Sequence, residues 1–273
     1  MVVRAASASL AGCECGSAVV DGRWQGTAVI LLHPGGLDSR TFDQDLPALT
    51  RSAGVLRYDR SGSGRSRRST GAVDRVEELR TVGVAAFGGR PVVLVGSSFG
   101  GQLAVDFALA HPGLVSGLLL IAPGLSGVAV SPARQARMAR LVAAARRGGD
   151  RLTDAWLSDR HLAPNGFSDT TTDLVRAMLR DNARLFVDPP ASVAPGDARR
   201  RLGELAAPGH VVVGEHDDRD AHAIARRLAR DARSLRLQVV AGAGHYPMLE
   251  RPGWLPEALT RLLNDVTDPA PRV

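Results

Sequence analysis

The sequence predicts an α/β fold in which a mostly parallel central sheet is flanked by helices and carries an inserted helical cap. Three observations predict this fold. Short apolar runs alternate with helical patterns along most of the 273 residues. The alternation is interrupted once, between Pro123 and about Gly203, where no strand-like run occurs. With 44% hydrophobic residues, the chain can bury one large core and a modest insertion.

The predicted strands are six apolar runs, and helical patterns fill most of the gaps between them. In chain order the runs are residues 29–32, 55–58, 92–95, 118–121, 211–213 and 237–240. This alternation favours a parallel sheet that is covered by helices on both faces. We place no strand in the first 24 residues, and we expect the tail at 268–273, which has two prolines, to fray.

The interruption predicts the domain organisation. Residues 1–123 and 204–273 are expected to form the core, and residues 124–203 the helical cap. The first cap helix is indicated by apolar residues at positions i, i+3, i+4 and i+7, which are Met138, Leu141, Val142 and Ala145. A second helix is expected over about 172–186, ending before Pro189-Pro190.

The segment Gly96-Ser97-Ser98-Phe99-Gly100 is the most informative motif of the chain. It follows the apolar run 92–95 and precedes a predicted helix over 102–110. The pattern G-x-S-x-G between a strand and a helix is typical of a nucleophile elbow, a tight turn that exposes the serine hydroxyl. We therefore predict Ser98 as a nucleophile, and the alternative is a serine that only occupies a turn.

A serine nucleophile needs a base that is itself oriented by a carboxylate. His245 is the expected base, because it lies in a glycine-rich loop directly after the last predicted strand. The carboxylate comes from the loop after the preceding predicted strand, where Asp217 is favoured and Asp218 and Glu215 are the alternatives. The chain order Ser98, Asp217, His245 is associated with one fold and differs from the order in the two large serine-protease groups.

Together these motifs resemble those of the α/β-hydrolase superfamily, and the resemblance covers nearly the whole chain. His33-Pro34-Gly35-Gly36 is similar to the oxyanion loop of the family, and the segment 59–66 is similar to a turn that these proteins carry after the next strand. Ser98 falls on the elbow, Asp217 on the G-x-x-D position and His245 on the G-x-G-H loop. The resemblance implies a capped serine hydrolase, similar to esterases, lactonases and carbon–carbon hydrolases.

The resemblance also implies an oxyanion hole made of two backbone amides. One is the amide of Phe99, the residue after the nucleophile. The other comes from the loop after the first predicted strand, where Pro34 has no amide hydrogen to donate. Gly35 is therefore the first choice and Gly36 the second. His33 is expected to support this loop and to take no part in the chemistry.

In this superfamily the cap usually defines the substrate pocket. We expect large apolar side chains of the cap, with the residue after the histidine, to line it. These candidates are Trp156, Leu157, Met178, Leu179, Phe186 and Tyr246. For each of them, simple packing of the cap on the core is the alternative.

The net charge of +6 does not indicate a nucleic-acid-binding protein. All 34 basic residues are arginine, which indicates a compositional bias. They are scattered over several predicted helices and follow no known nucleic-acid-binding pattern. The question left open is whether the arginines in or near the cap favour anionic substrates. These residues are Arg134, Arg137, Arg140, Arg146, Arg147 and Arg151.

No cofactor or metal is expected. Cys13 and Cys15 are too few and too close for a disulfide framework or a zinc site, and the G-x-G at 62–64 lacks the rest of a dinucleotide-binding pattern. No apolar run reaches transmembrane length, and the segment before Cys13 is too short and polar for a signal-peptide core. We expect a cytoplasmic monomer or homodimer that acts on a small molecule and binds neither membrane nor nucleic acid.

The leading hypothesis is a cofactor-independent serine hydrolase that cleaves an ester, lactone or thioester of a small organic molecule through an acyl-enzyme. One alternative is a non-hydrolytic enzyme of the same fold, such as a natural-product cyclase, a release enzyme or a haloperoxidase or perhydrolase. Another is a small-ligand-binding protein. Carbon–carbon hydrolysis is less favoured, because those relatives often carry Asn before the nucleophile, where this chain has Ser97. Fold and triad leave the substrate open.

Overall fold

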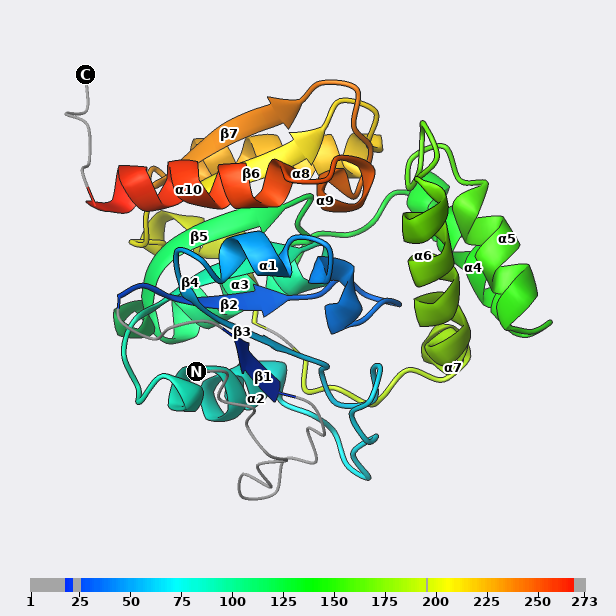
Figure 1. Cartoon of the computed structure of the whole chain (residues 1–273), viewed down its shortest axis with the longest axis horizontal. Helices are drawn as coiled ribbons and strands as arrows, with labels where there is room; N and C mark the ends of the chain where they lie inside the picture. Colours follow the sequence, from blue (N-terminus) through cyan, green and yellow to red (C-terminus); the bar gives the residue numbers. More distant parts are fainter. Residues whose placement is uncertain (1–17, 22–25, 195, 268–273) are drawn as a thin grey trace.

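Seven strands form one sheet in the computed structural model, which describes residues 18–21, 26–194 and 196–267 (Figure 1). The strand order is β1-β3-β2-β4-β5-β6-β7, and all strands except β1 run parallel to their neighbours. The parallel strands are β2 (Ala28–Leu32), β3 (Gly54–Tyr58), β4 (Val92–Ser97), β5 (Val115–Ile121), β6 (Gly209–Gly214) and β7 (Leu235–Val240). Each of the six predicted runs coincides with one of these strands, which confirms the α/β fold.

β1 (Ala18–Asp21) is the strand that the sequence did not predict. It pairs antiparallel with β3, with Ala18 opposite Tyr58. A four-residue run gives no detectable period, and its partner lies far along the chain, so the pairing could not be predicted from local sequence. The other residues among the first 24, including both cysteines, lie outside the described residues. The tail at 268–273 also lies outside them.

Alternate side chains of the strands enter two separate cores, one on each face of the sheet. Ile30 and Leu32 of β2 pack into one core, and Val29 and Leu31 pack into the other. The first core is covered by α2 (Arg75–Glu78), η2 (Leu79–Val84), α3 (Phe99–Ala110) and α8 (Arg219–Asp231). The second core is covered by α1 (Leu46–Leu49), α9 (Pro247–Glu250) and α10 (Trp254–Thr267). Burial on both faces explains why β2, β4, β5 and β6 are almost wholly apolar, whereas the edge strand β7 is largely exposed.

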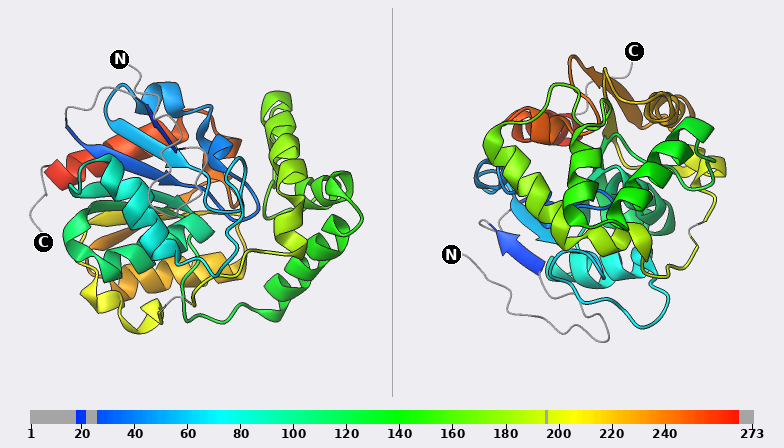
Figure 2. Two further views of the ribbon diagram at one scale, coloured as in Figure 1. Left: turned by 90° about the horizontal axis from the view of Figure 1, so that it is seen from below. Right: turned by 90° about the vertical axis from the view of Figure 1, so that its right-hand side faces the viewer.

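Four α-helices of the described chain lie between β5 and β6 and stand beyond the carboxyl ends of the strands (Figures 1 and 2). They are α4 (Pro132–Ala145), α5 (Gly149–Leu157), α6 (Asp169–Asp181) and α7 (Ala183–Val187). Leu141 and Ala145 of α4 are buried, as the helical period predicts. The arrangement places these helices over the edge of the sheet where the predicted nucleophile, acid and base emerge.

The single helix expected over 172–186 is wrong in two respects. α6 begins earlier, because the Ser168 side chain caps it by accepting a hydrogen bond from the Thr171 amide. The helix also ends at Asp181, and α7 starts again after Asn182, whose side chain bonds to the core. A tertiary contact therefore divides a segment that its local sequence presents as continuous.

Candidate active site

Ser98 lies at the sharp turn between β4 and α3, with a strained backbone of φ 52° and ψ −113°. Its amide donates to the Ile121 carbonyl at 2.8 Å, which fixes the turn against β5. A Cβ at Gly100 would overlap the carbonyl group of Leu32, and one at Gly96 would overlap the backbone of Gly100. Glycine is therefore required on both sides of Ser98, which explains the G-x-S-x-G spacing.

We expect Gly100→Ala to destabilise the fold by about 3 kcal/mol, because the added methyl group meets backbone atoms that cannot move independently. In an ordinary helix the same change is stabilising, so its sign distinguishes the close approach from simple helix propensity. Gly113→Ala is the matched control, because a Cβ there meets no atom within 4 Å. Chemical denaturation measures both variants. An unchanged midpoint for Gly100→Ala would contradict the elbow geometry.

The predicted nucleophile, base and acid lie in one hydrogen-bonded chain. His245 Nε2 lies 3.0 Å from Ser98 Oγ, and His245 Nδ1 lies 2.8 Å from Asp217 Oδ2. With Nδ1–H donating to Asp217, Nε2 is left to accept the Ser98 hydroxyl proton. The side chains of Asp217 and His245 are 1% and 6% exposed, so water screens their interaction weakly.

The two alternative acids have other contacts. Asp218 caps α8 by accepting from the Ala221 amide, and it forms ion pairs with Arg134 and Arg137 of α4. Burial alone would raise the pKa of Asp218, but the Arg134 guanidinium and the other donors outweigh it and hold the pKa well below its usual range. Glu215 accepts from the Gly242 amide at 2.7 Å. Of the three candidates, only Asp217 bonds to the histidine.

Glu250 holds the loop that carries His245. Its carboxylate accepts from the Gly244 amide at 2.9 Å and from the Tyr246 amide at 3.3 Å. Burial raises the pKa of Glu250. The His245 amide also donates to the His161 carbonyl at 2.9 Å. The amides on both sides of His245 are thus fixed from outside the loop.

The loop after β2 is held by Arg60, a residue that the sequence analysis placed only within a turn. The Arg60 guanidinium donates to the carbonyls of His33 and Pro34, and its own amide donates to His33 Nε2 at 3.2 Å. Burial, together with the Arg60 charge, holds the pKa of His33 well below its usual value, so this histidine is neutral. His33 is buried and bonds to this loop, in keeping with a supporting position.

A cavity of about 560 Å³ opens onto Ser98 and His245. Trp156, Phe186 and Tyr246 line it, together with Gly35 and Gly36. The Tyr246 ring packs edge-on against His245 and stacks on Trp156, so it links the cap to the base. Phe186 packs so closely on Gly36 that a Cβ at that glycine would lie 2.5 Å from its ring.

Met178, Leu157 and Leu179 do not line this cavity, which corrects the expectation for these residues. Met178 and Leu179 are fully buried between the cap and the core, and the Met178 sulfur accepts from the Thr41 hydroxyl at 3.7 Å. Helical period predicted burial correctly, but it could not tell which buried side chains face a cavity and which face another element.

Residues 29–258 match the family described as "Alpha/beta hydrolase family". This chain belongs to the alpha/beta hydrolase family. Over 244 residues it is 28% identical to the 2-succinyl-6-hydroxy-2,4-cyclohexadiene-1-carboxylate synthase of Enterobacter sp. (strain 638), a match that covers 86% of this chain and 91% of that one. Membership of this family identifies the protein as an enzyme of the α/β-fold hydrolase type.

Two solved structures illustrate the shared fold. MenH from S. aureus matches with a TM-score of 0.76 at 18% identity, covering 92% of this chain and 98% of its own. The enol-lactonase from Burkholderia xenovorans LB400 also gives a TM-score of 0.76, at 23% identity, covering 94% of this chain and 99% of its own. At these identities the likeness concerns the fold alone.

Within residues 18–21, 26–194 and 196–267, no group of three or more His, Cys, Asp or Glu side chains is placed to hold a metal ion. In the same ranges, no helix combines the length and apolar character needed to cross a membrane.

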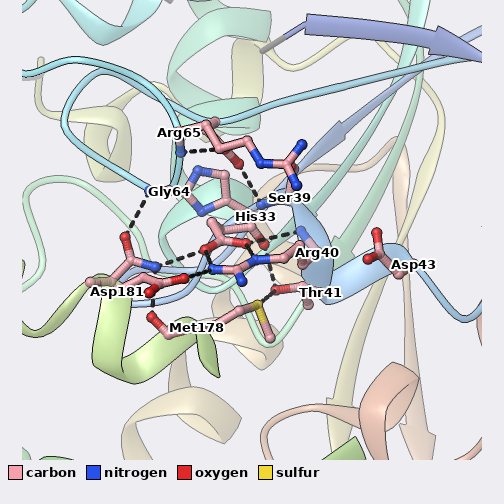
Figure 3. Close-up of polar contacts among 12 residues, drawn as sticks. His33, Ser39, Arg40, Thr41, Asp43, Gly64, Arg65, Met178 and Asp181 are labelled. Carbon is pink, nitrogen blue, oxygen red and sulfur yellow. Dashed lines mark hydrogen bonds and ion pairs between the residues drawn. The ribbon is translucent and has the colours of Figure 1, made fainter. Parts of the chain in front are cut away.

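In this hydrolase a polar network, buried at Asp38 and Asn182, joins the cap to the loop at 38–41 (Figure 3). Asn182, between α6 and α7, donates to Asp38 at 2.8 Å and accepts from the Gly64 amide at 2.8 Å. Arg40 bridges the carboxylates of Asp38 and Asp181, at 2.7 Å from each. The network fixes the start of α7, the helix that carries Phe186 to the cavity. None of these residues was predicted from the sequence to join the cap to the core.

We expect Asn182→Ala to lower the stability of the protein by about 2 kcal/mol, because it leaves the Gly64 amide without its acceptor and removes one hydrogen bond to Asp38, which keeps Arg40. Asn165→Ala is the matched control, since its amide makes one exposed bond to the Gly242 carbonyl. Thermal unfolding of both variants measures the effect. Equal melting temperatures would contradict the contribution to stability that we expect from this network.

Proposed function

We propose that the protein is a cofactor-independent serine hydrolase that cleaves an ester, lactone or thioester through an acyl-enzyme. The observation that carries this proposal is the chain of two hydrogen bonds, 2.8 and 3.0 Å long, from Asp217 through His245 to Ser98. The strained backbone of Ser98 adds support, because such strain is typical of catalytic positions and costs stability elsewhere.

In the proposed mechanism, His245 takes the hydroxyl proton as Ser98 Oγ attacks the substrate carbonyl carbon. Asp217 holds the imidazole in the required tautomer and stabilises its charged form. The amides of Phe99 and Gly35, with Gly36 as the second choice, donate to the oxyanion. His245 then protonates the leaving group. Water attacks the acyl-enzyme by the same route, and Ser98 regains its proton.

The substrate is proposed to be a small molecule that fits the cavity of about 560 Å³. We assign residues 124–203 to the cap and residues 1–123 with 204–273 to the core. Trp156, Phe186 and Tyr246 are the proposed apolar walls of the pocket. Two of them come from the cap, so cap residues are expected to control substrate choice.

The test is hydrolysis of p-nitrophenyl esters from acetate to octanoate, with labelling by a fluorophosphonate in parallel. Turnover that depends on Ser98 supports the proposal, and the preferred chain length outlines the pocket. Labelling without turnover indicates a live nucleophile with a cap that excludes these acyl groups. Silence in both assays would overturn the proposal and favour a small-ligand-binding protein.

The relative that is 28% identical over 244 residues favours a second candidate. That protein is named as a synthase, so the same arrangement of residues could serve a reaction without net hydrolysis. Product analysis in H₂¹⁸O separates the two. A hydrolase places one ¹⁸O atom in the released acid for each turnover, whereas a synthase or cyclase releases a product without it.

A further inference from the structure

The walls of the active-site cavity carry positive charge that no lining residue balances. Four arginines line the cavity, two from the core and two from the cap: Arg60, Arg75, Arg134 and Arg137. Among the described residues, neither Asp nor Glu lines it. Of the six arginines in or near the cap that the sequence offered for binding an anion, only Arg134 and Arg137 line this cavity. The core arginines Arg60 and Arg75 were not predicted to do so.

Arg60 is the least compensated of the four. It is 4% exposed, and its guanidinium bonds to backbone carbonyls and to His33, a neutral residue. In the described part of the chain, no carboxylate lies within ion-pair distance of its guanidinium, which stacks over the Phe99 ring at 5.0 Å. Burial lowers the pKa of Arg60 to about 10, so the group still carries its charge at neutral pH. Glu78 and Asp59 attract this charge from beyond ion-pair distance, but burial outweighs them, and an anion in the cavity would relieve the cost.

Arg75 stands close enough to Arg60 for the two charges to repel, and this repulsion adds to the lowering of the Arg60 pKa. One Arg75 terminal nitrogen pairs with Glu78 at 3.0 Å, and another donates to the Ser61 carbonyl at 3.2 Å. Its side chain is 12% exposed, and Arg75 lines the cavity, so part of the guanidinium group remains open to a ligand.

The carboxylates that pair with the other cavity arginines lie outside the lining. Arg134 and Arg137 share Asp218, and Asp220 stands 3.8 Å from Arg134. Like Glu78, these acids do not line the cavity. A ligand in the cavity therefore contacts arginines of the lining, whereas the carboxylates that pair with them lie outside the lining.

We propose that the substrate carries a free carboxylate in addition to the carbonyl that Ser98 attacks, and that Arg60 and Arg75 bind this carboxylate. The identity of the attacked bond rests on the proposed function, whereas the binding of an anion does not. A carboxylate supplies a counter-charge for these two cavity-lining arginines, and arginine is suited to bind it. The apolar residues that also line the cavity, including Trp156 and Phe186, suit the body of such a monoester.

The test uses Ser98→Ala, in which turnover is removed, and calorimetric titration with monomethyl adipate and dimethyl adipate. These probes share one carbon skeleton and differ by one negative charge. We expect the monoanion to bind at least about tenfold more tightly than the diester, since a charged hydrogen bond is worth about that factor or more. Adding Arg75→Gln should bring the ratio of the two affinities close to one. Adding Arg146→Gln, which removes an exposed cap arginine outside the cavity, should leave it unchanged.

Arg75→Gln removes one of the partners of the buried Glu78, which also accepts from the Ser61 amide, so its fold is checked by circular dichroism. If it does not fold, Arg75→Lys retains the charge beside Glu78 but loses the planar fork, and the ratio should still fall. The proposal would be overturned by equal affinities for the two probes, by a preference for the diester, or by no binding of the monoanion at millimolar concentration. It would also be overturned if the ratio of the two affinities were the same with and without the Arg75 substitution. Anion binding by a protein that hydrolyses no ester would overturn the proposed function and keep this site.

Discussion

Ser98→Ala is expected to lower kcat for p-nitrophenyl ester hydrolysis by about 10⁵–10⁶-fold, the loss typical of removing a serine nucleophile. The reason is that, among the described residues, no other hydroxyl bonds to His245 Nε2, so none can replace Ser98 in the attack on the carbonyl carbon. His245 Nε2 lies 3.0 Å from Ser98 Oγ, and the strained turn aims this one oxygen at the cavity. The remaining activity will come from substrate binding in the cavity and from stabilisation of the oxyanion while water attacks the substrate directly.

Ser97→Ala is the matched control. Ser97 is fully buried beside the nucleophile, and its hydroxyl has no hydrogen-bond partner. Removing that hydroxyl loses no bond, so kcat and thermal stability should stay close to those of the parent protein. Steady-state kinetics and thermal unfolding of both variants separate a lost nucleophile from a disturbed elbow. A Ser98→Ala protein that retains more than a small fraction of its activity would contradict the proposed mechanism.

Asp217→Asn is expected to lower kcat by about 10⁴-fold with little change in KM. An amide that donates to His245 Nδ1 favours the tautomer with the proton on Nε2, and that nitrogen then cannot accept the Ser98 proton. The change also removes the negative charge that stabilises the imidazolium. Because Asp217 is 1% exposed on its side chain, water cannot replace this charge.

Glu215→Gln tests whether another carboxylate of this loop, and not Asp217 alone, is needed to orient His245. Glu215 accepts from the Gly242 amide, and glutamine retains an acceptor for that bond. Its kcat should be close to that of the parent protein. If Glu215→Gln and Asp217→Asn lose activity equally, the loop as a whole positions the base and the assignment of Asp217 as the acid is wrong.

Much of this molecule could be predicted because its signals are local. The parallel strands are short apolar runs, and each was predicted from its own residues. The elbow could be predicted because a sharp turn against neighbouring backbone requires glycine at Gly96 and Gly100. Ser98, Asp217 and His245 follow three strands of one sheet, so strand order alone brings their loops to the same edge.

The remaining features depend on contacts between distant residues. Asn182 divides a predicted helix because it bonds to Asp38, which lies 144 positions away. Met178 was expected in the pocket, but it faces the core at Thr41. Arg60 and Arg75 were not predicted to line the cavity, because nothing in their own segments indicates that the turn at 59–66 closes over Phe99. Each of these features depends on packing between distant segments, which the periodicity of one segment cannot predict.

The most direct test of the central claim is peptide mass spectrometry of the protein after reaction with a fluorophosphonate. The claim is that Ser98 is the nucleophile that His245 activates. We predict one adduct per chain, located on Ser98, absent from Ser98→Ala and strongly slowed in Asp217→Asn. An adduct on a different residue, or ester hydrolysis by a protein that never labels at Ser98, would contradict it.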